Sequence, residues 1–122
     1  MEIAIKNYIE TEIPELCDRF SPLFVTDLDG IHVAYTSTPI SGGHVRQNQL
    51  ELKIIGRDYD ETEQMKQRLI TLLDTEEDEP FLVHHGIRFR CELSGGGCVY
   101  QDGPGCYENT IIFLVDWRKT DG

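Results

Sequence analysis

The segment 110–118 constrains the fold more than any other part of the chain, because it is apolar on both sides. Side chains of an extended strand alternate between two faces. Strands that are apolar on both faces are usually buried on both. We therefore expect a strand with something packed against each of its two faces. One face would carry Ile111, Phe113, Val115 and Trp117, and the other would carry Ile112 and Leu114.

Two helices are expected in the rest of the chain. Isoleucines at helical spacing predict a helix over about residues 2–19. Pro14 would kink or split this helix, because proline lacks a backbone N–H. A second helix is predicted over residues 59–74, with Asp58 as its N-cap and Glu61 three residues later, as in a capping box.

Strands account for most of the remainder. Alternating apolar and polar residues predict strands over residues 31–35, 45–56, 81–83, 87–93, 98–101 and 107–118. The glycines at 95–97 would interrupt this pattern, and His85 with Gly86 would form a turn. The order α-β-β-α-β-β-β, with room for one further strand, indicates an α+β fold: a mostly antiparallel sheet of about five strands with two helices on one face. The length of 122 residues fits one domain, residues 1–122.

Such a sheet would have more apolar surface than its helices can cover. Five strands span about 24 Å, whereas one helix covers about 10 Å, so two helices cover one face and little more. Ile55 would lie with Ile112 and Leu114 on the other face. Large exposed apolar patches usually mark interfaces, so we expect a second copy of the chain to cover this face. The alternative is a sheet that curls over itself and buries both faces internally.

The charge balance narrows the function. The chain has 22 acidic and 11 basic residues, which gives a net charge of -11. Nucleic-acid-binding proteins neutralise phosphates with Lys and Arg, so specific nucleic-acid binding is not expected. No apolar run approaches the roughly 20 residues that cross a bilayer, and the N-terminus lacks the layout of a signal peptide. We expect a protein of a reducing cytosol, whose four cysteines are thiols.

No motif predicts catalysis, a metal or a cofactor. The glycine-rich stretch 94–97 precedes a strand, so it lacks the helix N-terminus of a phosphate-binding loop. No C-x-x-C pair is present, although Cys98 and Cys106 could face each other across the last hairpin. Two alternatives stay open: a cytosolic regulatory module that binds a small ligand between sheet and helices, and a small enzyme with Cys98 or Cys106 as nucleophile.

The order of elements and several weak motifs carry a resemblance. A helix over residues 5–20 leads to a strand over 31–35 and then to the loop sequence TPISGG at 38–43. A long strand ending near Arg57, an acidic-capped helix over 58–73 and a last strand with an F-x-V pattern follow. In these features, across most of its length, the chain resembles the minor capsid and tail-completion (tail-terminator) proteins of long-tailed bacteriophages.

The resemblance implies a non-enzymatic structural subunit. Tail terminators form rings, typically hexameric, that cap a finished tail tube and join it to the head connector. The implied partners are copies of the chain itself, a tail-tube protein and a head-connector protein, without a membrane or a cofactor. DNA would pass through the ring without specific binding. The implied location is the host cytoplasm during assembly and then the virion, in its tail or neck.

One departure limits what the resemblance carries over. Such proteins often have a D-x-x-G-R-type turn before the last strand, whereas this chain has the sequence DGPGC at 102–106. The role of that arginine is therefore not transferred to any residue of this chain.

Two groups of residues are predicted to act in such a subunit. The oligomer interface would use the outer sheet face, the loop after the first strand and the tip of the last hairpin: Ile55, Ile112, Leu114, Ser41, Gly42, Gly43, His44, Asp102, Gly103, Pro104 and Gly105. An acidic lumen that repels passing DNA would use Asp74, Glu76, Glu77, Asp78 and Glu79. No catalytic, metal-binding or cofactor-binding residue is predicted.

Overall fold

A computed structural model describes residues 1–22, 30–43, 46–74 and 81–119. This part of the chain contains two α-helices, α1 (Glu2–Glu12) and α2 (Tyr59–Leu73), and a short 3-10 helix, η1 (Pro14–Leu16). It also contains six strands: β1 (Phe20–Pro22), β2 (His32–Ser41), β3 (Arg46–Gly56), β4 (Leu82–His84), β5 (Ile87–Gln101) and β6 (Cys106–Lys119).

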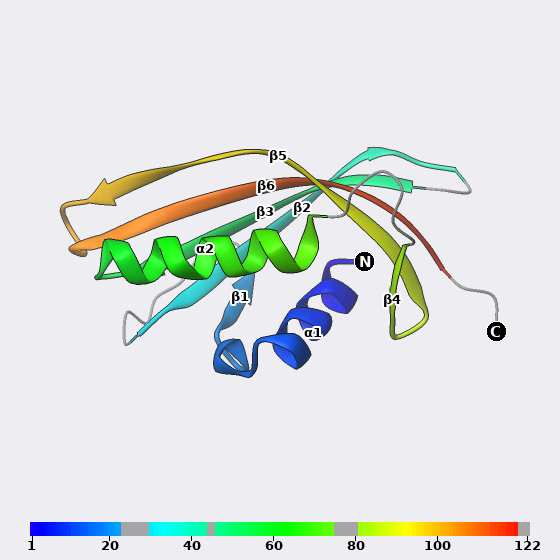
Figure 1. The fold of residues 1–122 in the computed structure, drawn as a ribbon. Coiled ribbons are helices and arrows are strands. Elements are labelled where there is room, and N and C mark those ends of the chain that lie inside the picture. The colour runs from blue at the N-terminus through cyan, green and yellow to red at the C-terminus, as the bar shows by residue number, and fades with distance from the viewer. Residues whose placement is uncertain (23–29, 44–45, 75–80, 120–122) are drawn as a thin grey trace.

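All six strands belong to one curled sheet in the order β1-β2-β3-β6-β5-β4, with α1 and α2 on the same side of it (Figure 1). Only the β1–β2 pair is parallel, and the other pairs are antiparallel. The α+β class and the mostly antiparallel sheet are therefore confirmed. Segment 110–118 belongs to β6, which lies between β3 and β5 along its length.

The strand count and strand limits differ from the prediction. The short β1 was not predicted, because three residues that end in proline have no alternating pattern. The predicted break at the glycines is wrong, because β5 runs continuously through residues 95–97. A register shift between Leu93 and Gly95 marks a β-bulge, which adds one residue to β5 without ending it. The first predicted strand also extends further, so that β2 includes Pro39.

The first helix is split at Pro14 as predicted but ends earlier than residue 19, whereas the second begins as predicted and ends one residue early. α1 ends at Glu12, and Pro14 stands at the start of η1, so the predicted helix over residues 2–19 is split at the proline. The Asp58 carboxylate accepts the backbone N–H of Asp60 at 3.0 Å and so caps the first turn of α2. This cap fixes the start of the helix that covers the middle of the sheet (Figure 1).

The core lies between the sheet and the two helices. Alternate residues of β3 and β6 are buried against apolar residues that recur at helical spacing in α1 and α2. Burying one such side chain stabilises the fold by about 1.5–3 kcal/mol. β6 buries several of them, so it contributes strongly to the stability of the sheet. The core residues of these elements include Ile5, Ile9, Leu50, Leu52, Ile54, Leu69, Leu73, Ile111, Phe113 and Val115.

Candidate functional site

The sheet has one face without a helix from the described residues, and we call it the open face (Figure 1). Because side chains alternate along a strand, the residues next to the core set in β3 and β6 point to this side. Register pairs place them in rows that run across the sheet. The open face of these two strands includes Gln47, Gln49, Glu51, Lys53, Ile55, Glu108, Thr110, Ile112, Leu114 and Asp116.

Ile112 and Leu114 lie in the middle of the open face, as predicted, and both are half-buried. No helix of the described chain lies over them, so their partial cover comes from the sheet itself. Gly95 adds nothing to that cover, because it has no side chain and stands directly opposite Ile112. The direct cross-strand neighbours of the two residues are Gln49, Glu51, Glu92 and Gly95.

Ile55 differs from these two residues. Its side chain is only 6% exposed and packs in a small cluster with Ala34 and Cys106. The expectation that Ile55 needs a cover from outside the chain is therefore wrong, because neighbouring strands of the same sheet already bury it. The part of the open face that still lacks a cover is the surface around Ile112 and Leu114.

The two predicted contact loops lie at opposite ends of the sheet (Figure 1). Ser41 ends β2, and Gly42 and Gly43 follow as exposed residues, whereas His44 lies outside the described residues. The turn 102–105 connects β5 to β6, and the Gly105 N–H donates to the Gln101 carbonyl at 2.9 Å. The structure therefore does not bring these two loops together, and each would need a contact of its own.

The loop after β2 borders a shallow pocket of about 420 Å³. The indole N–H of Trp117 donates to the Asn48 side chain at 2.8 Å, and the Asn48 amide donates to Ser37 at 3.0 Å. The Arg46 guanidinium lies 5.3 Å from the centre of the Trp117 ring. These contacts hold the floor of the pocket rigid, beneath a rim that includes Ile40 and Gly42.

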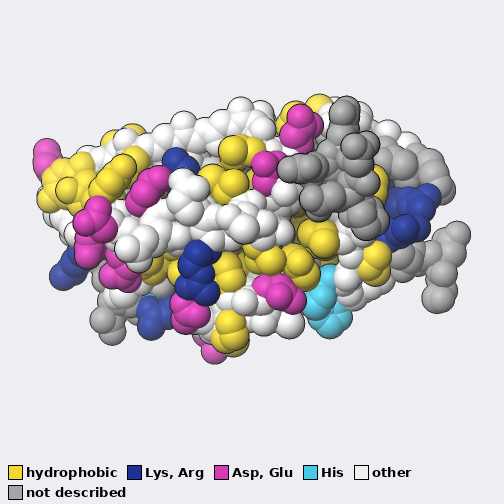
Figure 2. All heavy atoms as spheres, viewed as in Figure 1, with side chains coloured by type: hydrophobic (Ala, Val, Ile, Leu, Met, Phe, Trp, Pro, Cys, Tyr) yellow, Lys and Arg dark blue, Asp and Glu magenta, His cyan; other side chains and the backbone are white. Residues whose placement is uncertain are grey.

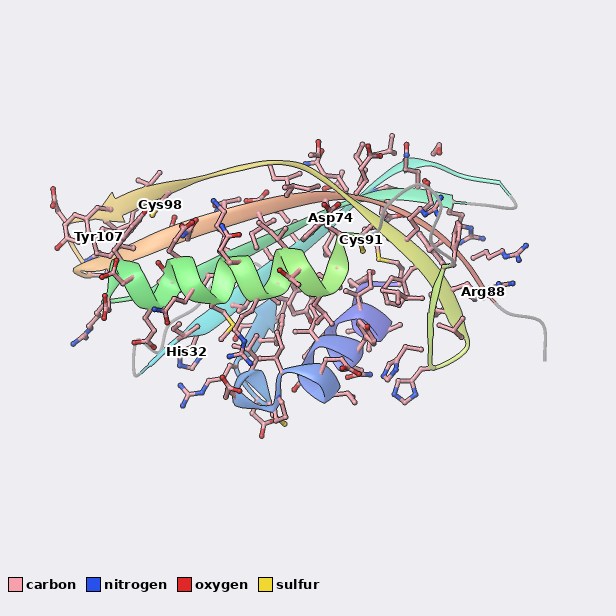
Figure 3. All side chains as sticks on the ribbon, viewed as in Figure 1. His32, Asp74, Arg88, Cys91, Cys98 and Tyr107 are labelled. Carbon is pink, nitrogen blue, oxygen red and sulfur yellow. The ribbon has the colours of Figure 1, made fainter. Side chains whose placement is uncertain are left out.

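Of the predicted acidic lumen, the structure describes only Asp74. Its carboxylate accepts the backbone N–H of Leu93 at 3.0 Å, and its backbone forms a bridge with Cys91 (Figure 3). Asp74 therefore fixes the end of α2 to β5. Glu76, Glu77, Asp78 and Glu79 lie outside the described residues.

The cysteines do not form the arrangement that the sequence left open. Cys98 stands opposite Asn109, and Cys106 stands opposite Gln101, so the two thiols do not face each other. Burial raises the pKa of the thiols of Cys91, Cys98 and Cys106, and the Asp18 carboxylate raises that of Cys17. A cysteine nucleophile needs a lowered pKa, so these surroundings disfavour one.

Two polar groups near α1 were not predicted. Ligand atoms of Glu10, Cys17 and Asp18 lie within 4.8 Å of one another. Glu10 is already engaged, because Lys6 lies 3.0 Å from its carboxylate and the Asp18 N–H donates to it at 3.0 Å. The second group, Glu15, Arg19 and Arg68, lines a pocket of about 390 Å³ between η1, α2 and the start of β2. The Glu15 carboxylate binds the Arg68 guanidinium, and a guanidinium nitrogen of Arg19 lies 3.1 Å from the His32 Nε2.

Basic side chains gather at the end of the sheet near β4. Arg88 stands directly opposite Arg118 across β5 and β6, an unfavourable like-charge pair. The Arg88 Nε is buried and has no hydrogen-bond partner in the described chain. Figure 2 shows part of this group at the right-hand end of the view. Among the 11 basic residues of the sequence, the five at this end are Arg46, Arg88, Arg90, Arg118 and Lys119.

Within the described ranges, no helix is both long and apolar enough to cross a membrane. A scan against protein-family models and a search of curated proteins both found no match to the chain.

Proposed function

We propose that the chain is a non-enzymatic virion assembly protein, a tail-terminator or minor capsid subunit that forms a ring between tail tube and head connector. The observation that carries this proposal is the open face, where Ile112 and Leu114 lie without a helix over them. Both side chains are half-buried, and apolar side chains that a sheet leaves partly exposed can contribute to an interface. The resemblance to tail-completion proteins rests on the order of elements, and the chain keeps that order: a helix, two strands joined through Gly42 and Gly43, and a capped helix.

The local chemistry supports a structural role more than a catalytic one. The raised pKa values of the thiols disfavour a cysteine nucleophile. The carboxylates with lowered pKa values, Glu10, Glu15 and Glu63, each accept hydrogen bonds from neighbouring groups of the fold. They thus serve contacts between elements of the chain.

The experiment is negative-stain imaging and mass photometry of the purified chain at micromolar concentration. We expect ring-shaped oligomers. Leu114→Asp places a charge on the open face and should shift the population to smaller species, because a desolvated, unpaired carboxylate is unfavourable in an interface. Thr71→Asp is the matched control, since it adds the same charge on the exposed side of α2. A strictly monomeric wild-type chain would contradict the proposal.

One observation favours a second candidate, a module that binds a small ligand. The pocket of about 390 Å³ beside Arg19 and Arg68 has a size that suits a small molecule. Its carboxylates and guanidinium groups would suit a ligand with both charges. This function requires no ring, so the same imaging experiment separates the two candidates.

A further inference from the structure

The outer edge of β5 is open over its second half. β6 pairs with β5 along its whole length on one side. On the other side, β4 pairs only with residues 87–89, and Asp74 engages Cys91 and Leu93. Beyond Leu93, no described strand pairs with this edge, although residues 94–101 are extended. Unpaired backbone groups on such an edge readily accept another strand.

The ladder shows which backbone groups point away from the sheet. In antiparallel pairs, consecutive residues point alternately toward and away from the neighbouring strand. The Leu93 N–H points away from β6, because it donates to Asp74. After the bulge, the residues in the equivalent position are Gly96, Cys98 and Tyr100. Each of them offers one N–H and one C=O to a new strand.

This edge also lacks the features that normally block edge strands. Natural edges commonly carry charges or proline at outward positions. The opposite edge of the sheet follows that rule at Pro39. The Val33 N–H donates outward to the backbone carbonyl of Arg19, so by alternation Pro39 also points outward, where it has no N–H to donate. Residues 94–101 contain neither a charge nor a proline. Two copies with a net charge of -11 can therefore meet here without like charges in the paired segment.

We propose that residues 95–101 pair with the same segment of a second copy, antiparallel about a two-fold axis at Cys98. Only this register pairs all three outward residues of both copies, with Gly96 opposite Tyr100 and Cys98 opposite itself. Large side chains then lie opposite glycines throughout the segment. Tyr100 and Val99, which are 50% and 56% exposed, stand opposite Gly96 and Gly97 of the other copy.

The pairing would extend the sheet across the dimer. A two-fold axis perpendicular to the sheet keeps both open faces on the same side of the extended sheet, so that Ile112 and Leu114 of both copies face the same way. The inference rests on the proposed function only for self-association, and it names one contact between two copies. A two-fold contact closes at a dimer, so a ring would need a second contact elsewhere on the chain.

The first test uses the thiols. Directly opposed, hydrogen-bonded residues have Cα atoms about 5.5 Å apart, within the span of a disulfide. Diamide, which takes up the two electrons and two protons of a thiol pair, should convert the wild-type chain to a covalent dimer on a non-reducing gel. Cys98 lies on the exposed stretch of β5 (Figure 3), so Cys98→Ser should abolish the product. Cys17→Ser, at the other exposed thiol, should leave it unchanged.

The second test changes the edge without disturbing the monomer. An added Cβ at Gly97 meets no atom within 4 Å, so Gly97→Lys should fold normally, as judged by circular dichroism. It places a charge in the paired segment, and the dimer Kd in sedimentation equilibrium should rise at least tenfold, about 1.4 kcal/mol. Thr71→Lys adds the same charge on α2 and should leave the Kd unchanged.

The outcomes separate this inference from the proposed function. An oligomer that ignores Gly97→Lys and gives no Cys98 cross-link overturns the inference and leaves the proposed function standing. A wild-type chain that is monomeric in both assays overturns both. A cross-link through Cys98 together with a weakened Gly97→Lys dimer supports the inference, even if no ring is seen by imaging.

Discussion

At Gly96, β5 approaches β6 so closely that an added Cβ would run into the carbonyl oxygen of Thr110. Its neighbours Gly95 and Gly97 meet no atom within 4 Å at the same position. Three adjacent glycines that look alike in the sequence therefore differ in the structure. Gly96 is required by the packing of two backbones, whereas the other two leave the open face bare beside Ile112.

This difference gives a prediction for alanine substitutions. Gly96→Ala should lower the free energy of unfolding by about 1–3 kcal/mol, because backbone atoms must move to relieve the overlap. Gly97→Ala should be neutral or stabilising by up to about 1 kcal/mol, since it only restricts the unfolded chain. Urea unfolding followed by the fluorescence of Trp117, the single tryptophan, measures both. Equal losses in the two variants would show that the close approach is not real.

At the scale of elements, α2 is attached to the sheet by a polar contact as well as by its apolar stripe. The buried Asn109 of β6 donates to the Glu63 carboxylate at 2.9 Å, and Gln67 donates to the same group at 3.2 Å. The hydrogen bond from Asn109, followed by that from Gln67, lowers the pKa of Glu63. The charged form of Glu63 is thus favoured in the folded state.

The pH dependence follows from the sign of that shift. A carboxyl group with a lowered folded-state pKa stabilises the protein above its unfolded pKa of about 4.3, and the contribution is lost as the pH falls through the lower folded value. Glu63→Gln should therefore cost about 1 kcal/mol at pH 7 and less at pH 3, which lies below the unfolded pKa of about 4.3. Urea unfolding of both proteins at each pH measures the difference. A cost that is equal at the two pH values would contradict a role for the charge.

The elements with strong periodicity could be predicted from the sequence, and the irregular ones could not. α2 has a clear apolar stripe and a capping aspartate, and β6 alternates without interruption. β5 and β2 were predicted too short because glycine and proline usually interrupt strands. In the structure, Gly96 fits a close backbone contact and Pro39 sits at an open edge, so both are compatible with a strand.

The residues of the candidate surface could likewise be predicted only in part. The faces of Ile112 and Leu114 could be predicted, because alternation alone determines them. The burial of Ile55 could not, since it depends on Ala34 and Cys106, which lie diagonally across from it on the two neighbouring strands, and the strand order was not predicted. The open edge of β5 was also missed, because an edge is defined by which strands lie beside it, and strand order is a property of the whole fold.

At the scale of the whole molecule, the charge is large and unevenly distributed. The chain carries -11 overall, while five of its 11 basic residues lie at the end of the sheet near β4. Two copies therefore repel each other at long range, apart from any contact made by the basic end. The uncharged segment 94–101 lies in the opposite part of β5, toward the hairpin that joins it to β6 (Figure 1). The surface around Ile112 lies in the middle of β6, away from the basic end.

This distribution predicts how salt affects self-association. Raising NaCl from 50 to 500 mM shortens the screening length to well under 10 Å and weakens the repulsion between copies. If the contact is made through backbone groups and apolar side chains, the Kd measured by sedimentation equilibrium should fall several-fold. A contact through Arg46, Arg88 and Arg118 would behave in the opposite way, because salt weakens ion pairs. A Kd that rises with NaCl would therefore place the interface at the basic end and not at the edge of β5.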